Sequence, residues 1–166
     1  MTTFLEQPLV ALTGAGISAE SGVPTFRGEE GLWHDYSAQE LATPGAFRRD
    51  PDLVWAWYAW RRDLIGACQA NAAHRTLVDM ERVLPRFTLI TQNVDGLHQA
   101  AGSQQVLELH GNIWRLRCTR CGKVTEDHRV PLPDLPPHCP ACDGLQRPDV
   151  VWFGESLPRQ VLDAAW

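Results

Sequence analysis

The chain has 166 residues, 44% of them hydrophobic, and its 15 basic and 20 acidic residues give a formal net charge of −5. This length and composition fit one globular domain with its own core and exclude a disordered chain. Because the sequence has no basic run, no apolar stretch of membrane length and no signal peptide, we expect a cytoplasmic protein that binds neither nucleic acid nor membrane.

The first predicted elements are a buried strand at residues 9–13 (LVALT) and a glycine-rich turn that opens a helix. In this context the pattern Gly14-x-Gly16-x-x-Ala19 is typical of dinucleotide-binding turns, where glycine lets the backbone approach a pyrophosphate. A glycine turn without a ligand has the same pattern. The ribose-binding acid that a dehydrogenase carries about twenty residues further on is not clear, which disfavours an oxidoreductase.

Helical and strand patterns then alternate along the chain. Residues 22–33 are rich in glycine and proline and predict a long loop. Asp50 followed by Pro51 predicts a helix start, and an apolar stripe continues that helix to residue 64. The other predicted elements are a helix over 71–83, strands over 87–91, 106–109, 114–117 and 150–153, and the opening turns of a helix over 158–166. This alternation predicts a parallel α/β sheet.

Four of the five cysteines form two Cys-x-x-Cys pairs inside a segment rich in cysteine and proline. Four thiolates can hold zinc in a tetrahedron at about 2.3 Å, and such a closed shell leaves no position for water, so the metal would be structural. Four buried or redox-active cysteines are the alternative, and His128 or His138 could replace one cysteine. Cys68 is expected to be a small buried residue inside a predicted helix. The expected zinc ligands are Cys118, Cys121, Cys139 and Cys142.

Several short motifs occur in a fixed order, namely GAGIS at 14–18, GVPTFR at 22–27, TQNVD at 91–95, His110-Gly111, the two cysteine pairs and VWFGE at 151–155. Over nearly the whole chain, this ordered set resembles the sirtuins, which are NAD-dependent protein-lysine deacylases. The resemblance implies a Rossmann-like parallel sheet, NAD as co-substrate and one structural zinc ion. The implied segments are a Rossmann-like catalytic part over 1–116 with a helical insertion at about 34–70, a zinc-binding module over 117–146, and a return to the Rossmann-like part over 147–166.

The resemblance also assigns roles to individual residues. His110 is the implied general base, although a lone histidine is more often structural, as we expect of His74 and His98. Phe153, Gly154 and Glu155 are implied to pair along the substrate peptide backbone. The implied NAD-binding residues are Gly14, Ala15, Gly16, Ser18, Ala19, Glu20, Thr25, Phe26, Arg27, Trp33, Gln92, Asn93, Val94 and Asp95, with packing roles left open for Phe26 and Trp33.

In the implied reaction, the acyl-lysine carbonyl oxygen attacks the anomeric carbon of the nicotinamide ribose, and nicotinamide leaves. His110 accepts a proton relayed from a ribose hydroxyl, which attacks the imidate carbon. Hydrolysis then yields lysine and O-acyl-ADP-ribose. The implied partners are acylated-lysine proteins, and the oligomeric state is left open.

Tyr58 and Arg61 indicate which acyl group is removed. Spaced i, i+3 on the predicted helix, they share one face, where Arg61 can pair with a carboxylate through two hydrogen bonds and Tyr58 can donate another. The pair resembles the Tyr-x-x-Arg of the bacterial class III sirtuins, which remove succinyl and malonyl groups, and Thr25 agrees with this class. The alternative is that Tyr58 packs in the core and that Arg61 and Arg62 are surface arginines.

The resemblance ends soon after Glu155. Sirtuins continue with a Gly-Thr-Ser motif and an asparagine-containing strand end that bind the adenosine half of NAD, and neither is present here. We therefore expect a C-terminally truncated relative or a fragment. The competing hypothesis is a zinc-containing remnant that binds peptide without catalysis, whereas a nicotinamide oxidoreductase would need a hydride site that the sequence does not offer.

Overall fold

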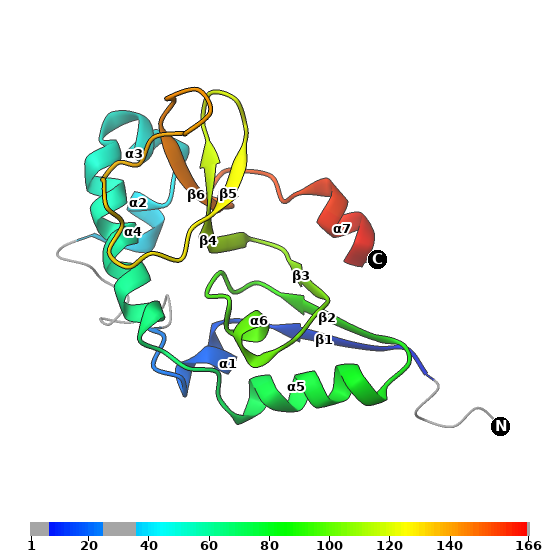
Figure 1. Ribbon diagram of the computed structural model, residues 1–166. Coiled ribbons are helices and arrows are strands. Elements are labelled where there is room, and N and C mark those ends of the chain that lie inside the picture. Colours follow the sequence, from blue (N-terminus) through cyan, green and yellow to red (C-terminus); the bar gives the residue numbers. More distant parts are fainter. Residues whose placement is uncertain (1–6, 25–35, 166) are drawn as a thin grey trace.

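Figure 1 shows a computed structural model of the chain, which describes residues 7–24 and 36–165. A parallel sheet in the order β1-β2-β3 is formed by β1 (Leu9–Thr13), β2 (Phe87–Thr91) and β3 (Val106–Glu108). In register, Leu9 pairs with Phe87, and Leu89 pairs with Val106. The parallel sheet predicted from the alternation of elements is confirmed.

The helices begin where the sequence provides caps. In α4 (Pro51–Gly66), the Asp50 side chain accepts a hydrogen bond of 2.9 Å from the Leu53 N–H, and Pro51 occupies the first turn. In α5 (Ala72–Val83), the Asn71 side chain caps the first turn, and the helix packs against β2. The remaining helices are α1 (Ala15–Ala19), α2 (Ala38–Leu41), α3 (Pro44–Arg49), α6 (Leu97–Ala101) and α7 (Arg159–Ala165), of which α2, α3 and α6 were not predicted.

A second, antiparallel sheet in the order β5-β4-β6 is formed by β4 (Gly111–Cys118), β5 (Val124–Glu126) and β6 (Gln146–Val150). The strand predicted over 150–153 was wrong, because the strand ends at Val150. The strand over Gln146–Val150 was not predicted because it contains Pro148, and proline is disfavoured inside strands. Its missing N–H is tolerated because β6 lies at the edge of the sheet.

Cys68 also departs from its prediction. It lies just beyond the end of α4 rather than inside the helix, and it is half-buried. In the described part of the chain, no helix is both long enough and apolar enough to cross a membrane.

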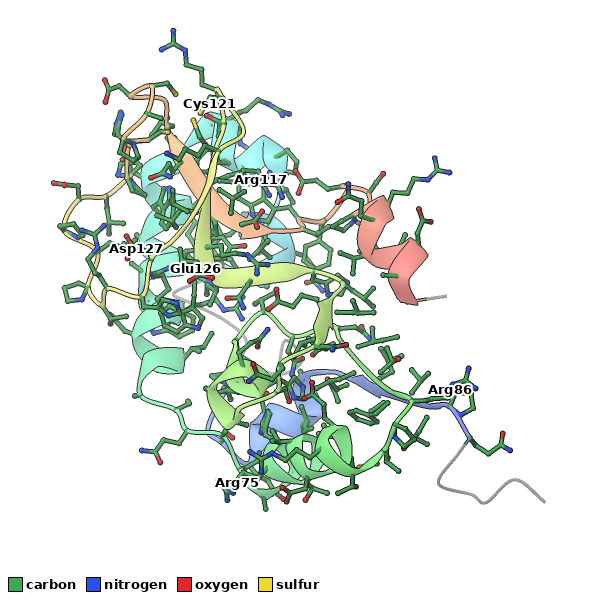
Figure 2. The ribbon with its side chains drawn as sticks, turned by 45° about the vertical axis from the view of Figure 1, so that its right-hand side comes forward. Arg75, Arg86, Arg117, Cys121, Glu126 and Asp127 are labelled. Carbon is green, nitrogen blue, oxygen red and sulfur yellow. The ribbon has the colours of Figure 1, made fainter. Side chains whose placement is uncertain are left out.

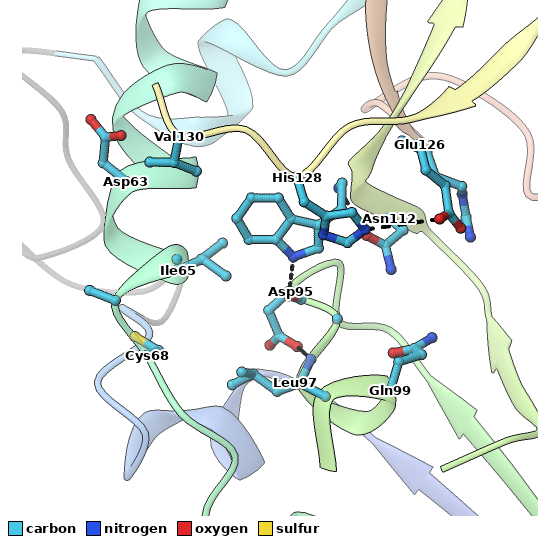
Figure 3. A pocket seen from close by; sticks show the side chains of 16 residues that line it. Asp63, Ile65, Cys68, Asp95, Leu97, Gln99, Asn112, Glu126, His128 and Val130 are labelled. Carbon is cyan, nitrogen blue, oxygen red and sulfur yellow. Dashed lines mark hydrogen bonds and ion pairs between the residues drawn. The ribbon is translucent and has the colours of Figure 1, made fainter. Parts of the chain in front are cut away.

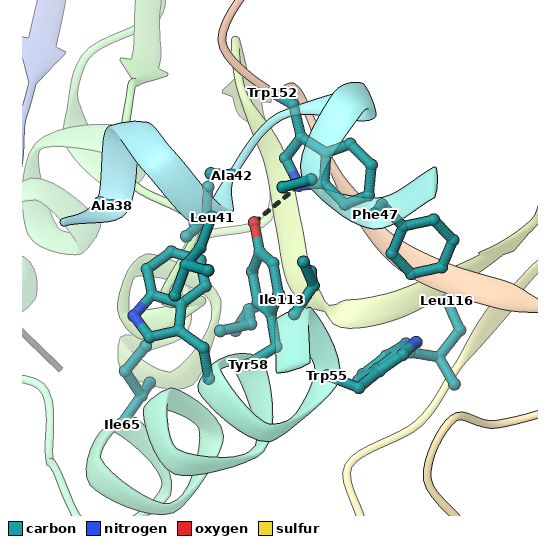
Figure 4. Packing of buried hydrophobic residues seen from close by; sticks show 14 of the residues in the cluster. Ala38, Leu41, Ala42, Phe47, Trp55, Tyr58, Ile65, Ile113, Leu116 and Trp152 are labelled. Carbon is teal, nitrogen blue, oxygen red and sulfur yellow. Dashed lines mark hydrogen bonds between the residues drawn. The ribbon is translucent and has the colours of Figure 1, made fainter. Parts of the chain in front are cut away.

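The main core lies between α4 and the second sheet (Figure 4). Trp55 and Tyr58 of α4 are 0% exposed and pack in one cluster with Ile113 of β4 and Trp152. Two indole N–H groups fix the packing: Trp55 donates to the Gln146 carbonyl at 2.9 Å, and Trp152 donates to the Tyr58 hydroxyl at 2.8 Å. Long-range bonds of this kind hold α4 against the zinc module and the segment after β6.

Candidate functional site

A cavity of about 850 Å³ lies where the loops after β1, β2 and β3 meet α4 and the segment after β6. These loops converge because the carboxyl ends of parallel strands share one edge of the sheet. Many of the residues that the resemblance implicates therefore line one cavity, and these are Gly14, Ala15, Gly16, Tyr58, Arg61, Gln92, Asn93, Val94, His110, Phe153, Gly154 and Glu155.

Among the described residues, the other predicted NAD-binding residues do not line this cavity. Ser18 and Asp95 are buried, whereas Ala19 and Glu20 are exposed at the end of α1. The remaining four, Thr25, Phe26, Arg27 and Trp33, lie outside the described residues.

Hydrogen bonds join the glycine turn to the loop after β2. The Asn93 side-chain amide donates to the Gly14 carbonyl at 3.0 Å and to the Ser18 hydroxyl at 3.1 Å. The Ser18 hydroxyl donates in turn to the Asp95 carboxylate at 2.7 Å. Because Ser18 is 0% exposed, this network fixes both loops. A Cβ atom on Gly14 or Gly16 would meet no atom of the described residues within 4 Å, so these residues leave the backbone of the turn open to a ligand.

His110 lines the cavity in a defined tautomer. Its Nδ1 lies 2.9 Å from the Gln92 carbonyl oxygen, which can only accept a hydrogen bond. Nδ1 therefore carries a proton, and in the neutral form of the ring the lone pair belongs to Nε2. A general base needs such a lone pair, so the orientation of the ring suits proton abstraction.

Gly111 fixes the main chain next to His110. Its φ of +79° lies in the left-handed region, and a Cβ atom at this position would lie 2.0 Å from the Asp149 carbonyl oxygen. On the other side of the peptide, the His110 carbonyl accepts a hydrogen bond of 2.9 Å from the Val151 N–H. The close approach of β6 thus requires glycine and sets the position of the histidine.

His74 and His98 form a buried support beneath the glycine turn. Their ring centroids are 4.9 Å apart, and His98 Nε2 lies 2.9 Å from the Thr13 hydroxyl oxygen. His74 Nε2 lies 3.5 Å from the Ser18 hydroxyl oxygen. Burial lowers the pKa of His74 and lowers that of His98 to about 4, so both rings are neutral near pH 7.

Helix α4 presents Tyr58 and Arg61 to the cavity, as their i, i+3 spacing predicts. The Tyr58 hydroxyl accepts the hydrogen bond from Trp152 that Figure 4 marks. Burial raises the pKa of Tyr58 to about 12, so the phenol stays protonated and can still donate one bond. Arg61 is half-buried, and its Cζ lies 5.1 Å from the ring centroid of Trp57.

Arg62 is not the surface arginine of the alternative interpretation, because it is only 1% exposed. Its Nη1 donates to the Ile113 carbonyl at 2.7 Å, and its Nη2 donates to the Asp127 carbonyl at 2.6 Å. Its guanidinium also lies 4.9 Å from the Trp114 ring centroid. One residue step turns about 100° around a helix, so Arg62 anchors α4 to the second sheet while its neighbour faces the cavity.

The segment over 153–155 forms one wall of the cavity. The Phe153 N–H donates to the Ala42 carbonyl at 2.9 Å. The Glu155 carboxylate accepts two bonds from the Arg147 guanidinium, at 2.6 and 2.9 Å, and one from the Trp152 N–H at 2.8 Å. Glu155 therefore braces this segment, and the pairing of the segment with a peptide backbone stays a prediction.

Some residues that line the cavity were not identified from the sequence. Trp57, Val151 and Trp152 contribute to its walls. The apolar stripe of the predicted helix assigned Trp57 to the core, where it is 2% exposed. The signal that could have placed it at the site is its position next to Tyr58 and one turn before Arg61.

The four paired cysteines converge at one end of the second sheet, and Figure 2 shows Cys121 at the end of the molecule away from Arg75 of α5. The sulfur atoms all lie within 4.8 Å of one another, with 3.5 Å between Cys118 and Cys142 and 3.8 Å between Cys121 and Cys139. A tetrahedron with metal–sulfur bonds of about 2.3 Å has sulfur–sulfur edges of about 3.8 Å. The donor set therefore fits one structural zinc ion, and the two histidines between the pairs are more than half exposed.

A second cavity, of about 930 Å³, lies between the end of α4, the start of α6 and residues 126–130 (Figure 3). In its wall, the Trp114 and His128 rings stack with centroids 5.5 Å apart. Among the described residues that line it, neither His110 nor the glycine turn is present. The smaller cavity is therefore the candidate active site, because it alone of the two combines a base with an open glycine turn.

Comparison with known proteins identifies the family. Residues 14–166 match the Sir2 family. The chain belongs to the Sir2 family. An NAD-dependent protein deacylase of Aquifex aeolicus is 60% identical over 158 residues, which cover 95% of this chain and 66% of that relative. The predicted resemblance to sirtuins is confirmed.

Solved Sir2 structures share the fold of this Sir2-family chain. A Sir2 homologue–NAD complex is 53% identical with a TM-score of 0.85, covering 93% of this chain and 60% of the other. A Sir2 complex with an inhibitor, 2′-O-acetyl-ADP-ribose and a deacetylated p53 peptide is 35% identical with a TM-score of 0.79, covering 95% and 64%. The Rossmann-like fold is confirmed, and the chain spans less than two thirds of these relatives.

Proposed function

We propose that this chain carries the catalytic centre of an NAD-dependent protein-lysine deacylase, which yields nicotinamide, O-acyl-ADP-ribose and the free lysine. The observation that supports this most directly is the candidate active-site cavity. It joins a histidine of fixed tautomer to an open glycine turn and to Asn93, as a base and a dinucleotide site require. The name of the Aquifex aeolicus relative and the NAD complex of a Sir2 homologue support the same assignment.

Several residues of the cavity and of the loop after β2 have a stated task in this proposal. NAD, when bound, supplies the reactive anomeric carbon and the nicotinamide leaving group. Gly14 and Gly16 leave the backbone free for the pyrophosphate, while Asn93 and Asp95 hold the adjoining loop. His110 Nε2 accepts the proton from a ribose hydroxyl, since Nδ1 is engaged by the Gln92 carbonyl. The zinc ion is structural and takes no part in the reaction.

We further propose that the acyl groups removed include acetyl and, preferentially, succinyl and malonyl. The neutral Tyr58 phenol retains a proton to donate, because Trp152 already supplies the bond that its oxygen accepts. Arg61, on the same helix face, provides a cation for the distal carboxylate. An acyl group without a carboxylate would gain neither the ion pair nor these hydrogen bonds.

Nicotinamide release from NAD in the presence of an acyl-lysine peptide tests the reaction. The wild-type chain should release nicotinamide, and His110→Ala should abolish the release. His128→Ala is the matched control, because this histidine is 68% exposed and lies outside the candidate active-site cavity, so its activity should stay near wild type. A folded, zinc-loaded wild-type chain that binds peptide without releasing nicotinamide would instead support a non-catalytic binding protein.

The acyl preference has a separate test in Arg61→Met. We expect desuccinylation to fall at least about tenfold more than deacetylation, because hydrogen bonds to a charged group contribute about 1.5–3 kcal/mol. Arg61→Lys keeps the charge but loses the paired hydrogen bonds, so it should give an intermediate loss. Equal losses on succinyl and acetyl peptides would contradict the preference.

A further inference from the structure

The indole N–H of Trp57 is a buried donor that lacks an acceptor. The side chain is 2% exposed, yet within residues 7–24 and 36–165 its Nε1 makes no hydrogen bond. Burial without a partner costs the hydration of the group, so native proteins rarely leave such a donor unpaired. An orphaned donor in a cavity wall therefore indicates a bond that a ligand completes.

The neighbouring tryptophans show how unusual this donor is. Trp55 donates to the Gln146 carbonyl at 2.9 Å, Trp114 to the Asp95 carbonyl at 2.7 Å, and Trp152 to the Tyr58 hydroxyl at 2.8 Å. In the described part of the chain, the other buried polar side-chain atoms without a partner belong to Arg62, His98 and Ser103, and these three residues do not line the candidate active-site cavity. Trp57 combines an unpaired donor with a place in that cavity.

Trp57 contacts both Tyr58 and Arg61, the two residues that the proposed function assigns to the acyl group. The Tyr58 ring centroid is 4.6 Å from that of Trp57, at an interplanar angle of 71°, and the Arg61 guanidinium lies over the indole at 5.1 Å. These contacts hold the indole in a fixed orientation. The three residues line the same cavity, and their side chains carry an indole N–H, a phenol O–H and a guanidinium.

We propose that Trp57 is a specificity-determining residue, whose N–H donates to the terminal carboxylate of a succinyl- or malonyl-type acyl group. The inference rests on the proposed deacylase function and deepens it. A carboxylate offers about four acceptor positions. Arg61 fills two through its paired N–H groups, and Tyr58 and Trp57 fill one each, so every acceptor of the buried carboxylate has a donor.

The test compares Trp57→Phe with the wild type on two peptides whose acyl chains have equal length, succinyl-lysine and butyryl-lysine. Phenylalanine keeps an aromatic face beneath Arg61 but removes the N–H. We expect kcat/KM for the succinyl peptide to fall roughly tenfold, as for the loss of one hydrogen bond to a charged group, and for the butyryl peptide to fall less than about twofold. Equal losses on both peptides would show a packing role and overturn the inference.

Trp55→Phe is the matched control. Trp55 lies on the same helix, but its indole N–H donates to the Gln146 carbonyl, and the residue does not line the cavity. The Trp55→Phe variant should change kcat/KM for the succinyl and the butyryl peptide by the same factor. If Arg61→Met loses the succinyl preference while Trp57→Phe keeps it, the inference about Trp57 fails and the proposed function stands. If the wild type releases no nicotinamide with either peptide, the proposed function fails.

A binding measurement decides the role of Trp57 without turnover. In an indole ¹H–¹⁵N spectrum assigned with the Trp57→Phe variant, the Trp57 N–H resonance should move downfield on adding the succinyl peptide and stay in place with the butyryl peptide. A resonance that stays in place with both peptides would overturn the inference.

Discussion

Replacing Arg62 with methionine tests how α4 is held to the rest of the protein. The guanidinium donates to the carbonyls of Ile113, Asp127 and Arg129 at 2.7, 2.6 and 3.1 Å, and it pairs with the Asp127 carboxylate at 3.6 Å. Methionine fills similar space but removes the guanidinium as a donor to three carbonyls. Removing one partner of a buried charged network costs about 3–5 kcal/mol, a large part of the about 5–15 kcal/mol that a folded domain has in total.

Urea unfolding followed by tryptophan fluorescence measures this loss in the free energy of unfolding. Arg61→Met is the matched control, because the same change one residue earlier removes a half-buried side chain that faces the cavity. We expect it to cost less than about 1 kcal/mol, which is typical away from buried networks. The reasoning would be refuted if the two variants had the same stability, or if Arg62→Met cost less than about 1 kcal/mol.

Two further predictions concern pH and metal. The folded-state pKa of His98 is about 4, mainly because of burial and next because of His74, against an ordinary value of 6.5. The unfolded chain therefore takes up the proton first, and unfolding free energy should fall by about 3 kcal/mol as pH drops from 6.5 to about 4. His98→Gln should flatten this fall in urea titrations, and an unchanged slope would contradict the assignment. Chelating zinc, or Cys121→Ser, should lower the urea midpoint and the bound zinc measured by atomic absorption; an unchanged midpoint after complete zinc removal would argue against a structural metal.

Elements with strong local signals were predictable from the sequence. The apolar runs over 9–13 and 87–91 form β1 and β2 with the predicted bounds, and the Asp50-Pro51 pair starts α4. Short elements such as α2, α3 and β5 were missed, because three to six residues carry too little periodicity to predict. The predicted position of β6 was wrong for a different reason. The strand tolerates Pro148 only because it lies at the edge of the sheet, and that edge position exists only in the assembled sheet.

The candidate active site was likewise predictable from the sequence only in part. The ordered motifs identified the glycine turn, His110 and the four cysteines, because each motif is a local arrangement of residue types that its chemistry requires. They could not show that His110 Nδ1 is held by the Gln92 carbonyl, or that Gly111 is required by the approach of Asp149. Both contacts join residues that are far apart in the sequence.

The sequence by itself determined the family, the parallel sheet and the identity of the metal-binding cysteines. The tertiary structure decided what three side chains of α4 do: Arg61 faces the cavity, Arg62 anchors the second sheet, and the Trp57 N–H has no acceptor among the described residues. The reason is physical. Helical spacing fixes the relative directions of these side chains, but only packing against distant strands determines which direction leads to a partner and which to an open cavity.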